Sequence, residues 1–210
     1  MQDEFNNEEI LEIAYWSALI KWKEGRAQPA INALLNLLED DIDISLQSKI
    51  YLSIAEIYFE QNLNEKSMDY LDLAAQKIKE RSEKDQIYYR IAELSFKQED
   101  YSRSLTAYKE VIKNTQIKSR QQLSNLKIVQ IYRFQKKYDM ASTSIKNMLL
   151  DDNYQSIYAA LELELAKLYQ IQNMYDEYIS RLNSILEDFP RTKESAESVS
   201  YTHLRAHETR

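Results

Sequence analysis

The sequence of 210 residues contains no cysteine, one glycine, two prolines and two histidines. Without cysteine, the chain can form no disulfide, thiol nucleophile or thiolate metal site. So little glycine and proline leaves almost no turn chemistry for β-hairpins, so we expect a helical chain. A single glycine also cannot build a glycine-rich phosphate-binding loop. The sequence thus predicts no enzyme, because it offers no usual base, nucleophile or cofactor motif.

The charge balance limits the class of partner. The formal net charge is −7, and an acidic chain repels phosphate backbones, so we expect no nucleic-acid partner. The first residues, MQDEFNNEEILE, are acidic where a signal peptide would be basic, and no stretch is long and apolar enough to insert into a membrane. The compartment stays open: cytoplasm if Met1 is the true start, periplasm or cell envelope if the chain is a fragment of a secreted protein.

What the sequence does contain is a fixed period. One mostly small position recurs every 37 residues, at Ala18, Ala55, Ala92, Val129 and Ala166. Positions nine and sixteen residues later recur in register with it. A period of this size is typical of a solenoid, in which each unit buries its apolar face against its neighbours.

Within one period, two helical patterns follow each other. In residues 48–84, Tyr51, Ile54 and Tyr58 mark one helical face, and Leu71 and Ile78 mark a second. We therefore predict an all-α, right-handed helical-repeat solenoid over residues 1–198. Its five helix–turn–helix units cover residues 11–47, 48–84, 85–121, 122–158 and 159–195.

These residues resemble the tetratricopeptide repeat. The resemblance rests on segments such as Tyr15–Asp41 and Tyr51–Ala75, with a small residue, an aromatic, a turn and a second small residue at the family's offsets. The unit is longer than the roughly 34 residues of that family. With the linker LEDFPRTKESAES (Leu186–Ser198), it is similar to repeats of bacterial envelope-assembly and Tol–Pal-associated proteins. The resemblance implies a protein-binding scaffold in such an assembly; the alternative is a sensory or regulatory input module of a longer signalling or transcription-control protein.

The resemblance also implies where a protein or peptide partner would bind. Partners of this family usually lie in the concave groove lined by the first helix of each unit. We interpret Trp22, Phe59 and Phe96 either as an aromatic ladder for a ligand or as packing between adjacent first helices. No cofactor is implied, and the oligomeric state is not predicted. The candidate groove residues are Tyr15, Leu19, Trp22, Leu52, Glu56, Phe59, Tyr89, Glu93, Phe96, Gln130, Arg133 and Lys167.

The end of the chain departs from the period. Residues 196–198 would start a truncated sixth unit, and residues 199–210, VSYTHLRAHETR, resemble the translation of a sequencing-library adapter. We therefore predict a non-native tail. Both histidines, His203 and His207, lie in it at the i, i+4 spacing of a zinc pair. Leu204 stands where the glutamate of that motif would be and no third ligand is evident, so no metal site is predicted.

Overall fold

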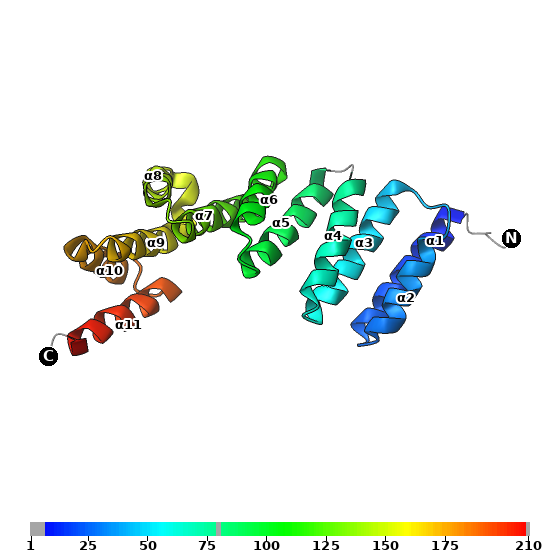
Figure 1. Cartoon of the computed structure of the whole chain (residues 1–210), viewed down its shortest axis with the longest axis horizontal. Coiled ribbons are helices and arrows are strands. Elements are labelled where there is room, and N and C mark those ends of the chain that lie inside the picture. The colour runs from blue at the N-terminus through cyan, green and yellow to red at the C-terminus, as the bar shows by residue number, and fades with distance from the viewer. Residues whose placement is uncertain (1–6, 79–80, 209–210) are drawn as a thin grey trace. The chain divides into compact units, whose positions relative to one another are not determined.

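The computed structural model describes residues 7–78 and 81–208, with side chains described as far as Tyr201. The chain forms two compact units, unit 1 (Met1–Thr115) and unit 2 (Gln116–Arg210). Figure 1 shows that each is built from helices packed in consecutive pairs. Unit 1 contains α1 (Asn7–Lys23), α2 (Ala27–Leu37), α3 (Ile44–Glu60), α4 (Asn64–Lys77), α5 (Arg81–Lys97) and α6 (Tyr101–Asn114). Unit 2 contains α7 (Lys118–Phe134), α8 (Tyr138–Leu149), the 3₁₀ helix η1 (Asp152–Ile157), α9 (Tyr158–Ile171), α10 (Tyr175–Asp188) and α11 (Lys193–Glu208).

The helices keep the period of the sequence. The first helices of successive pairs begin at residues 7, 44, 81 and 118, and the second helices at 27, 64, 101, 138 and 175. Each of the first four pairs thus starts four residues before the unit boundary expected from the sequence. In the fifth pair, η1 occupies the residues that would open α9, so α9 begins at Tyr158. The described residues form helices and no strand, which confirms the predicted fold class of stacked helical repeats.

Every first helix ends in the same way. The backbone φ is positive at Gly25, Asn62, Glu99, Lys136 and Asn173, which are again spaced by the period. In the first pair the Gly25 amide donates to the Trp22 carbonyl at 2.8 Å, and the Arg26 amide donates to the Lys21 carbonyl at 2.9 Å. These two bonds satisfy the last carbonyls of the helix in the Schellman pattern, which requires one left-handed residue. Glycine adopts that conformation freely, whereas glutamate and lysine do so at a cost of about 1 kcal/mol.

The core lies between the two helices of each pair and between neighbouring pairs. The recurring small position is buried in all five copies, which lets the second helix approach closely. Ser67 Oγ donates to the Ala55 carbonyl at 2.8 Å, and Ser104 Oγ makes the same bond to Ala92 at 2.9 Å. In the fifth pair Tyr178 takes the place of these serines and packs with the buried apolar residues of α9 and α10.

Helix α11 crosses the start of the predicted tail without a break. The Thr192 hydroxyl accepts a bond from the Ser195 amide at 3.1 Å, which caps the helix. Ser198 is fully buried, and the half-buried Tyr201 packs against the α9–α10 core. The side chains of His203 and His207 lie outside the described residues. The non-native origin of residues 199–210 stays a prediction.

Candidate partner-binding face

Nine of the twelve candidate groove residues lie on the first helices of unit 1, that is on α1, α3 and α5. Tyr15 is the most buried of them, and its hydroxyl shares a 2.9 Å hydrogen bond with Ser53 Oγ of α3. Burial raises the pKa of the Tyr15 phenol, and the bond to Ser53 offsets part of that rise. Leu19 and Leu52 are half-buried. This part of the face is therefore mostly apolar, with Tyr15 joined to the neighbouring helix.

Trp22, Phe59 and Phe96 form what we call the aromatic row, one ring at the same position of each first helix in unit 1. All three side chains are half-buried. Trp22 Nε1 donates to Glu60 Oε2 at 2.8 Å. The Phe59 ring lies 4.4 Å from the Arg90 guanidinium carbon, a cation–π contact. The Phe96 ring meets Tyr101 edge to face, with 5.9 Å between centroids. Each ring is thus held by a neighbouring side chain and keeps part of its surface in solvent.

Two glutamates of the face are engaged by partners within unit 1. The Arg90 guanidinium donates to both Glu56 oxygens, from Nε at 2.7 Å and from Nη2 at 2.6 Å, across α5 and α3. The Tyr108 hydroxyl donates to the Glu93 carboxylate, and the Tyr89 ring lies edge-on to Tyr108 at 6.3 Å. Burial, followed by the contact with Glu93, raises the pKa of the Tyr108 phenol.

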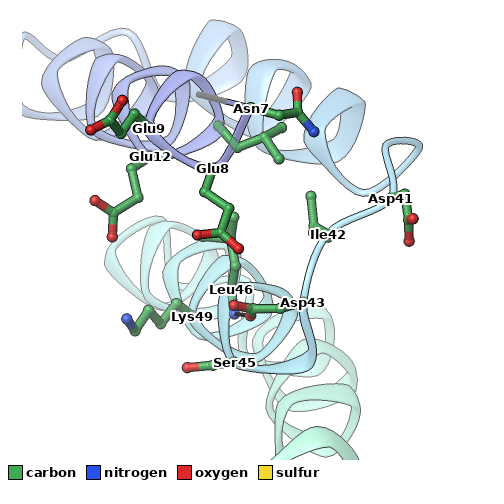
Figure 2. A pocket seen from close by; sticks show the side chains of 11 residues that line it. Asn7, Glu8, Glu9, Glu12, Asp41, Ile42, Asp43, Ser45, Leu46 and Lys49 are labelled. Atoms are coloured by element: carbon green, nitrogen blue, oxygen red, sulfur yellow. Dashed lines mark hydrogen bonds between the residues drawn. The ribbon is translucent and has the colours of Figure 1, made fainter. Parts of the chain in front are cut away.

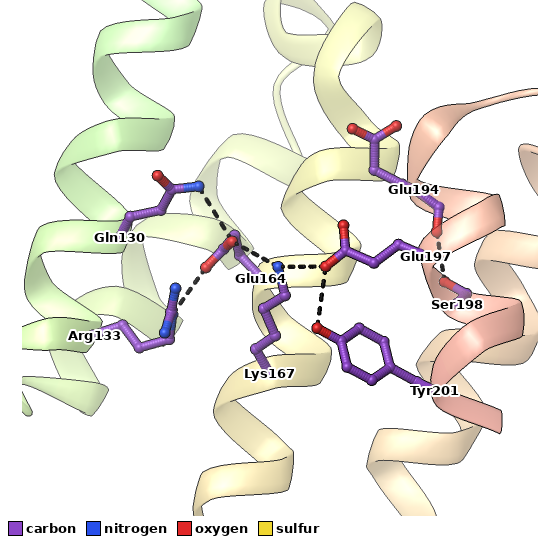
Figure 3. A network of polar contacts seen from close by, with 8 residues as sticks. All are labelled: Gln130, Arg133, Glu164, Lys167, Glu194, Glu197, Ser198 and Tyr201. Carbon is purple, nitrogen blue, oxygen red and sulfur yellow. Dashed lines mark hydrogen bonds and ion pairs between the residues drawn. The ribbon is translucent and has the colours of Figure 1, made fainter. Parts of the chain in front are cut away.

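The three candidates in unit 2 are brought together by one buried carboxylate, as Figure 3 shows. Glu164 of α9 accepts from Gln130 Nε2 at 3.2 Å and from Arg133 Nε at 3.0 Å, both on α7. Lys167 Nζ lies 3.3 Å from the same carboxylate. The Glu164 side chain is only 5 % exposed, so these three donors replace the water that would otherwise stabilise its negative charge.

Lys167 extends this network to α11. Its Nζ lies 3.0 Å from Glu197 Oε1, which also accepts from the Tyr201 hydroxyl at 3.2 Å. Burial lowers the pKa of the Lys167 ammonium, but attraction by Glu164 and Glu197 outweighs it, so the pKa is raised. The contacts of Lys167 are thus ionic contacts within unit 2.

Arg90 and Glu164 are central to these contacts but are absent from the candidates named by the sequence. They occupy the same position of the repeat, two residues before the small residue. Each contacts a candidate residue 34 positions earlier, Arg90 with Glu56 and Glu164 with Gln130. Complementary side chains at this 34-residue separation are the signal that could have found them.

A separate hollow of about 710 Å³ lies in unit 1 between the start of α1 and the start of α3. Figure 2 shows its lining, which is rich in carboxylates and has Lys49 as its one cation among the described residues. Asp43 caps α3 by accepting from the Leu46 amide at 2.6 Å. Its acidic lining residues are Glu8, Glu9, Glu12, Asp41 and Asp43.

Within the part of the chain that the structure describes, no three histidine, cysteine or acidic side chains are grouped so that they could hold a metal ion. None of the helices described here is long and apolar enough to span a membrane.

The arrangement of the helices is shared with known structures. MamA has a TM-score of 0.68 and 14 % identity, over 92 % of this chain and 96 % of that chain. YrrB, described as a TPR protein with an unusual peptide-binding site, has a TM-score of 0.67 and 11 % identity, over 89 % of this chain and 90 % of that one. The chain has the tetratricopeptide-repeat fold.

A third similar structure is a signal-transduction ATPase with a tetratricopeptide repeat sensor, from Pyrococcus horikoshii. It has a TM-score of 0.64 and 17 % identity, over 94 % of this chain and 31 % of its own chain. No protein-family profile and no curated protein sequence matches the chain.

Proposed function

We propose that the chain is a non-catalytic protein-interaction scaffold, and that the first helices of unit 1 bind a peptide or a partner helix in a concave groove. The observation that carries this proposal is the aromatic row. Three half-buried rings at one position of successive helices offer a repeated apolar surface. Aromatic side chains dominate binding energy at protein interfaces. Because neighbours hold these rings, less side-chain entropy is lost when a ligand binds.

The corresponding surface of unit 2 offers less to an apolar ligand. Arg133 takes the place of the aromatic ring there and is paired with Glu164. A ligand that displaced Arg133 would leave the buried Glu164 carboxylate without this cation, which is costly. The apolar part of the ligand is therefore assigned to unit 1. The peptide-binding site named for YrrB supports a ligand of this class on the same fold.

The double variant Phe59→Ala plus Phe96→Ala tests the proposal. Tagged wild type and variant are used to recover partners from a lysate of the source organism, and the recovered proteins are quantified by mass spectrometry. We expect the variant to lose most of the partner, because it removes two of the three rings. Leu150→Ala is the matched control, since Leu150 is 87 % exposed and lies in unit 2. Equal recovery by all three folded proteins would contradict the proposal.

We further propose that the partner belongs to an assembly of the bacterial cell envelope, on the basis of the repeat length and the Leu186–Ser198 linker. The second candidate is a sensory input module, favoured by the likeness to the ATPase with a repeat sensor. The gene sequence around this segment separates the two. A lipoprotein signal upstream supports the envelope scaffold, and a catalytic or DNA-binding domain encoded in the same frame supports the sensor.

A further inference from the structure

Helix α1 carries a row of large apolar side chains that face solvent. They follow one another at steps of three or four residues and therefore share one side of the helix. This side lies opposite the face that packs on α2 and α3 through Leu11 and Ala18. We call these residues the α1 stripe: Ile10, Ile13, Trp16 and Ile20, which are 53, 52, 58 and 58 % exposed.

In other first helices of the repeat, the side that corresponds to the α1 stripe is buried. In α3, Ile50 and Ile57 occupy the positions of Ile13 and Ile20 and are fully buried against the α1–α2 pair. The same positions are buried in α5 and in α9, where they hold Ile87, Leu94, Leu161 and Leu168. The side is therefore the surface on which a preceding helix pair packs. In Figure 1, α1 and α2 stand at the N-terminal end of unit 1, with α3 on one side of them.

A side of a helical array that stays in contact with solvent is expected to be polar. The α1 stripe is apolar instead. Its Trp16 is also much larger than Ser53, which takes that position in α3 and bonds to Tyr15. Four exposed large apolar side chains in one row are typical of an interaction surface.

The charges beside the stripe indicate which surface covers it. Glu9 and Lys23 continue the spacing of the stripe at its two ends, Glu9 four residues before Ile13 in the first turn of α1 and Lys23 three residues after Ile20 in its last turn. When two α1 helices pack antiparallel, the acidic start of one lies beside the basic end of the other. A parallel arrangement would bring like charges together. The surface is therefore complementary to itself under a twofold axis, as a symmetric dimer interface must be.

We propose that the α1 stripe is the twofold interface of a homodimer, in which α1 packs antiparallel against α1 of a second copy of the chain. Ile10 then faces Ile20 of the second copy, and Ile13 and Trp16 lie near the axis. The interface uses the outer side of α1, so it is independent of the aromatic row.

Sedimentation velocity on the full chain tests the dimer, over concentrations from about 1 to about 100 µM, where small helical interfaces associate. We expect concentration-dependent dimerisation by the wild type and at least about tenfold weaker association by Ile13→Lys plus Ile20→Lys. Both side chains are exposed, so the fold should survive, and circular dichroism checks this. Leu150→Lys is the control and should dimerise as the wild type does. A wild type that stays monomeric, or an equal loss in the control, would overturn the proposal.

The orientation can be tested because the chain has no cysteine of its own. Single variants Ile10→Cys and Ile20→Cys are oxidised separately and as a mixture. Antiparallel packing predicts that the mixture gives mainly the mixed disulfide, because only that pair of positions comes within disulfide reach. Preferential disulfides between two Ile10→Cys chains would show parallel packing and refute the interface. Dimerisation that appears only after residues 1–6 are removed would show that this segment covers the stripe, which would also refute it.

Discussion

Units 1 and 2 use one repeat position in opposite ways. The position four residues after the small residue holds Phe59 and Phe96 in unit 1 and Arg133 in unit 2. The rings of unit 1 keep part of their surface in solvent, whereas Arg133 is paired with a carboxylate that is almost fully buried. The same backbone register therefore supports a row of partly exposed rings in one unit and an internal ionic network in the other. The identity of the side chain, more than its position in the repeat, decides which of the two forms.

The variant with the largest expected effect is Glu164→Gln, which keeps the shape of the side chain and removes its charge. Arg133 and Lys167 would then lose the anion between them. We expect the free energy of unfolding to fall by about 2 kcal/mol, below the cost of breaking a fully buried pair because both cations keep some exposure. Urea unfolding followed by circular dichroism measures the loss.

Glu56→Gln is the matched variant in unit 1. Its partner Arg90 is more exposed than Arg133 and also rests on the Phe59 ring, so we expect a loss of about 1 kcal/mol. Both tryptophans, Trp16 and Trp22, lie in unit 1, so their fluorescence reports that unit. Glu164→Gln should shift the dichroism transition more than the fluorescence transition. An equal or larger loss from Glu56→Gln would contradict the expectation that the buried network of unit 2 stabilises the protein more than the Glu56–Arg90 pair of unit 1.

The turns that follow the first helices also allow the two units to be compared. Gly25 in unit 1 and Lys136 in unit 2 have the same left-handed conformation at the same position of the repeat. We expect Lys136→Gly to stabilise the protein by up to about 1 kcal/mol, and Gly25→Ala to destabilise it by about 1 kcal/mol. A Cβ at Gly25 would meet no atom within 4 Å beyond its two chain neighbours, so the second effect comes from the backbone conformation. Thermal unfolding of both variants checks the signs, and a destabilising Lys136→Gly would contradict the account of the turns.

The pH dependence of Lys167 gives the smallest effect. Its pKa is raised from the usual value of 10.5, so the folded state holds the proton more tightly than the unfolded state does. The stability that this proton provides is present below pH 10.5 and is lost as the pH rises through the folded-state pKa. The difference in the free energy of unfolding between the wild type and Lys167→Met should therefore shrink as the pH rises above 10.5. A difference that stays constant from neutral pH to pH 11 would show that the charge of Lys167 does not stabilise unit 2.

Much of the fold follows from the sequence because the determinants repeat. Ala55 and Ala92 mark positions where only a small side chain fits between two helices, and both are fully buried. The period also aligns Lys136 with Gly25, although lysine by itself gives no sign of a left-handed turn.

What the period does not predict is set by local chemistry or by packing in three dimensions. Residues 152–157 form a 3₁₀ helix that delays α9 by three residues relative to the period. The pairing of Glu164 with Arg133 depends on how α9 rests on α7, which periodicity alone does not specify. For the same reason, the sequence named Arg133 and Lys167 as groove residues without revealing the carboxylate that engages them.

Site-specific photo-crosslinking tests the central claim, that a partner binds the aromatic row of unit 1, most directly. A photoreactive phenylalanine analogue replaces Phe59 in one protein and Gln170 in another. Gln170 is exposed and holds the same repeat position in unit 2. Irradiation in the lysate should yield a covalent partner adduct from position 59 and little from position 170. Adducts from position 170 but not from position 59, with both proteins folded, would contradict the claim.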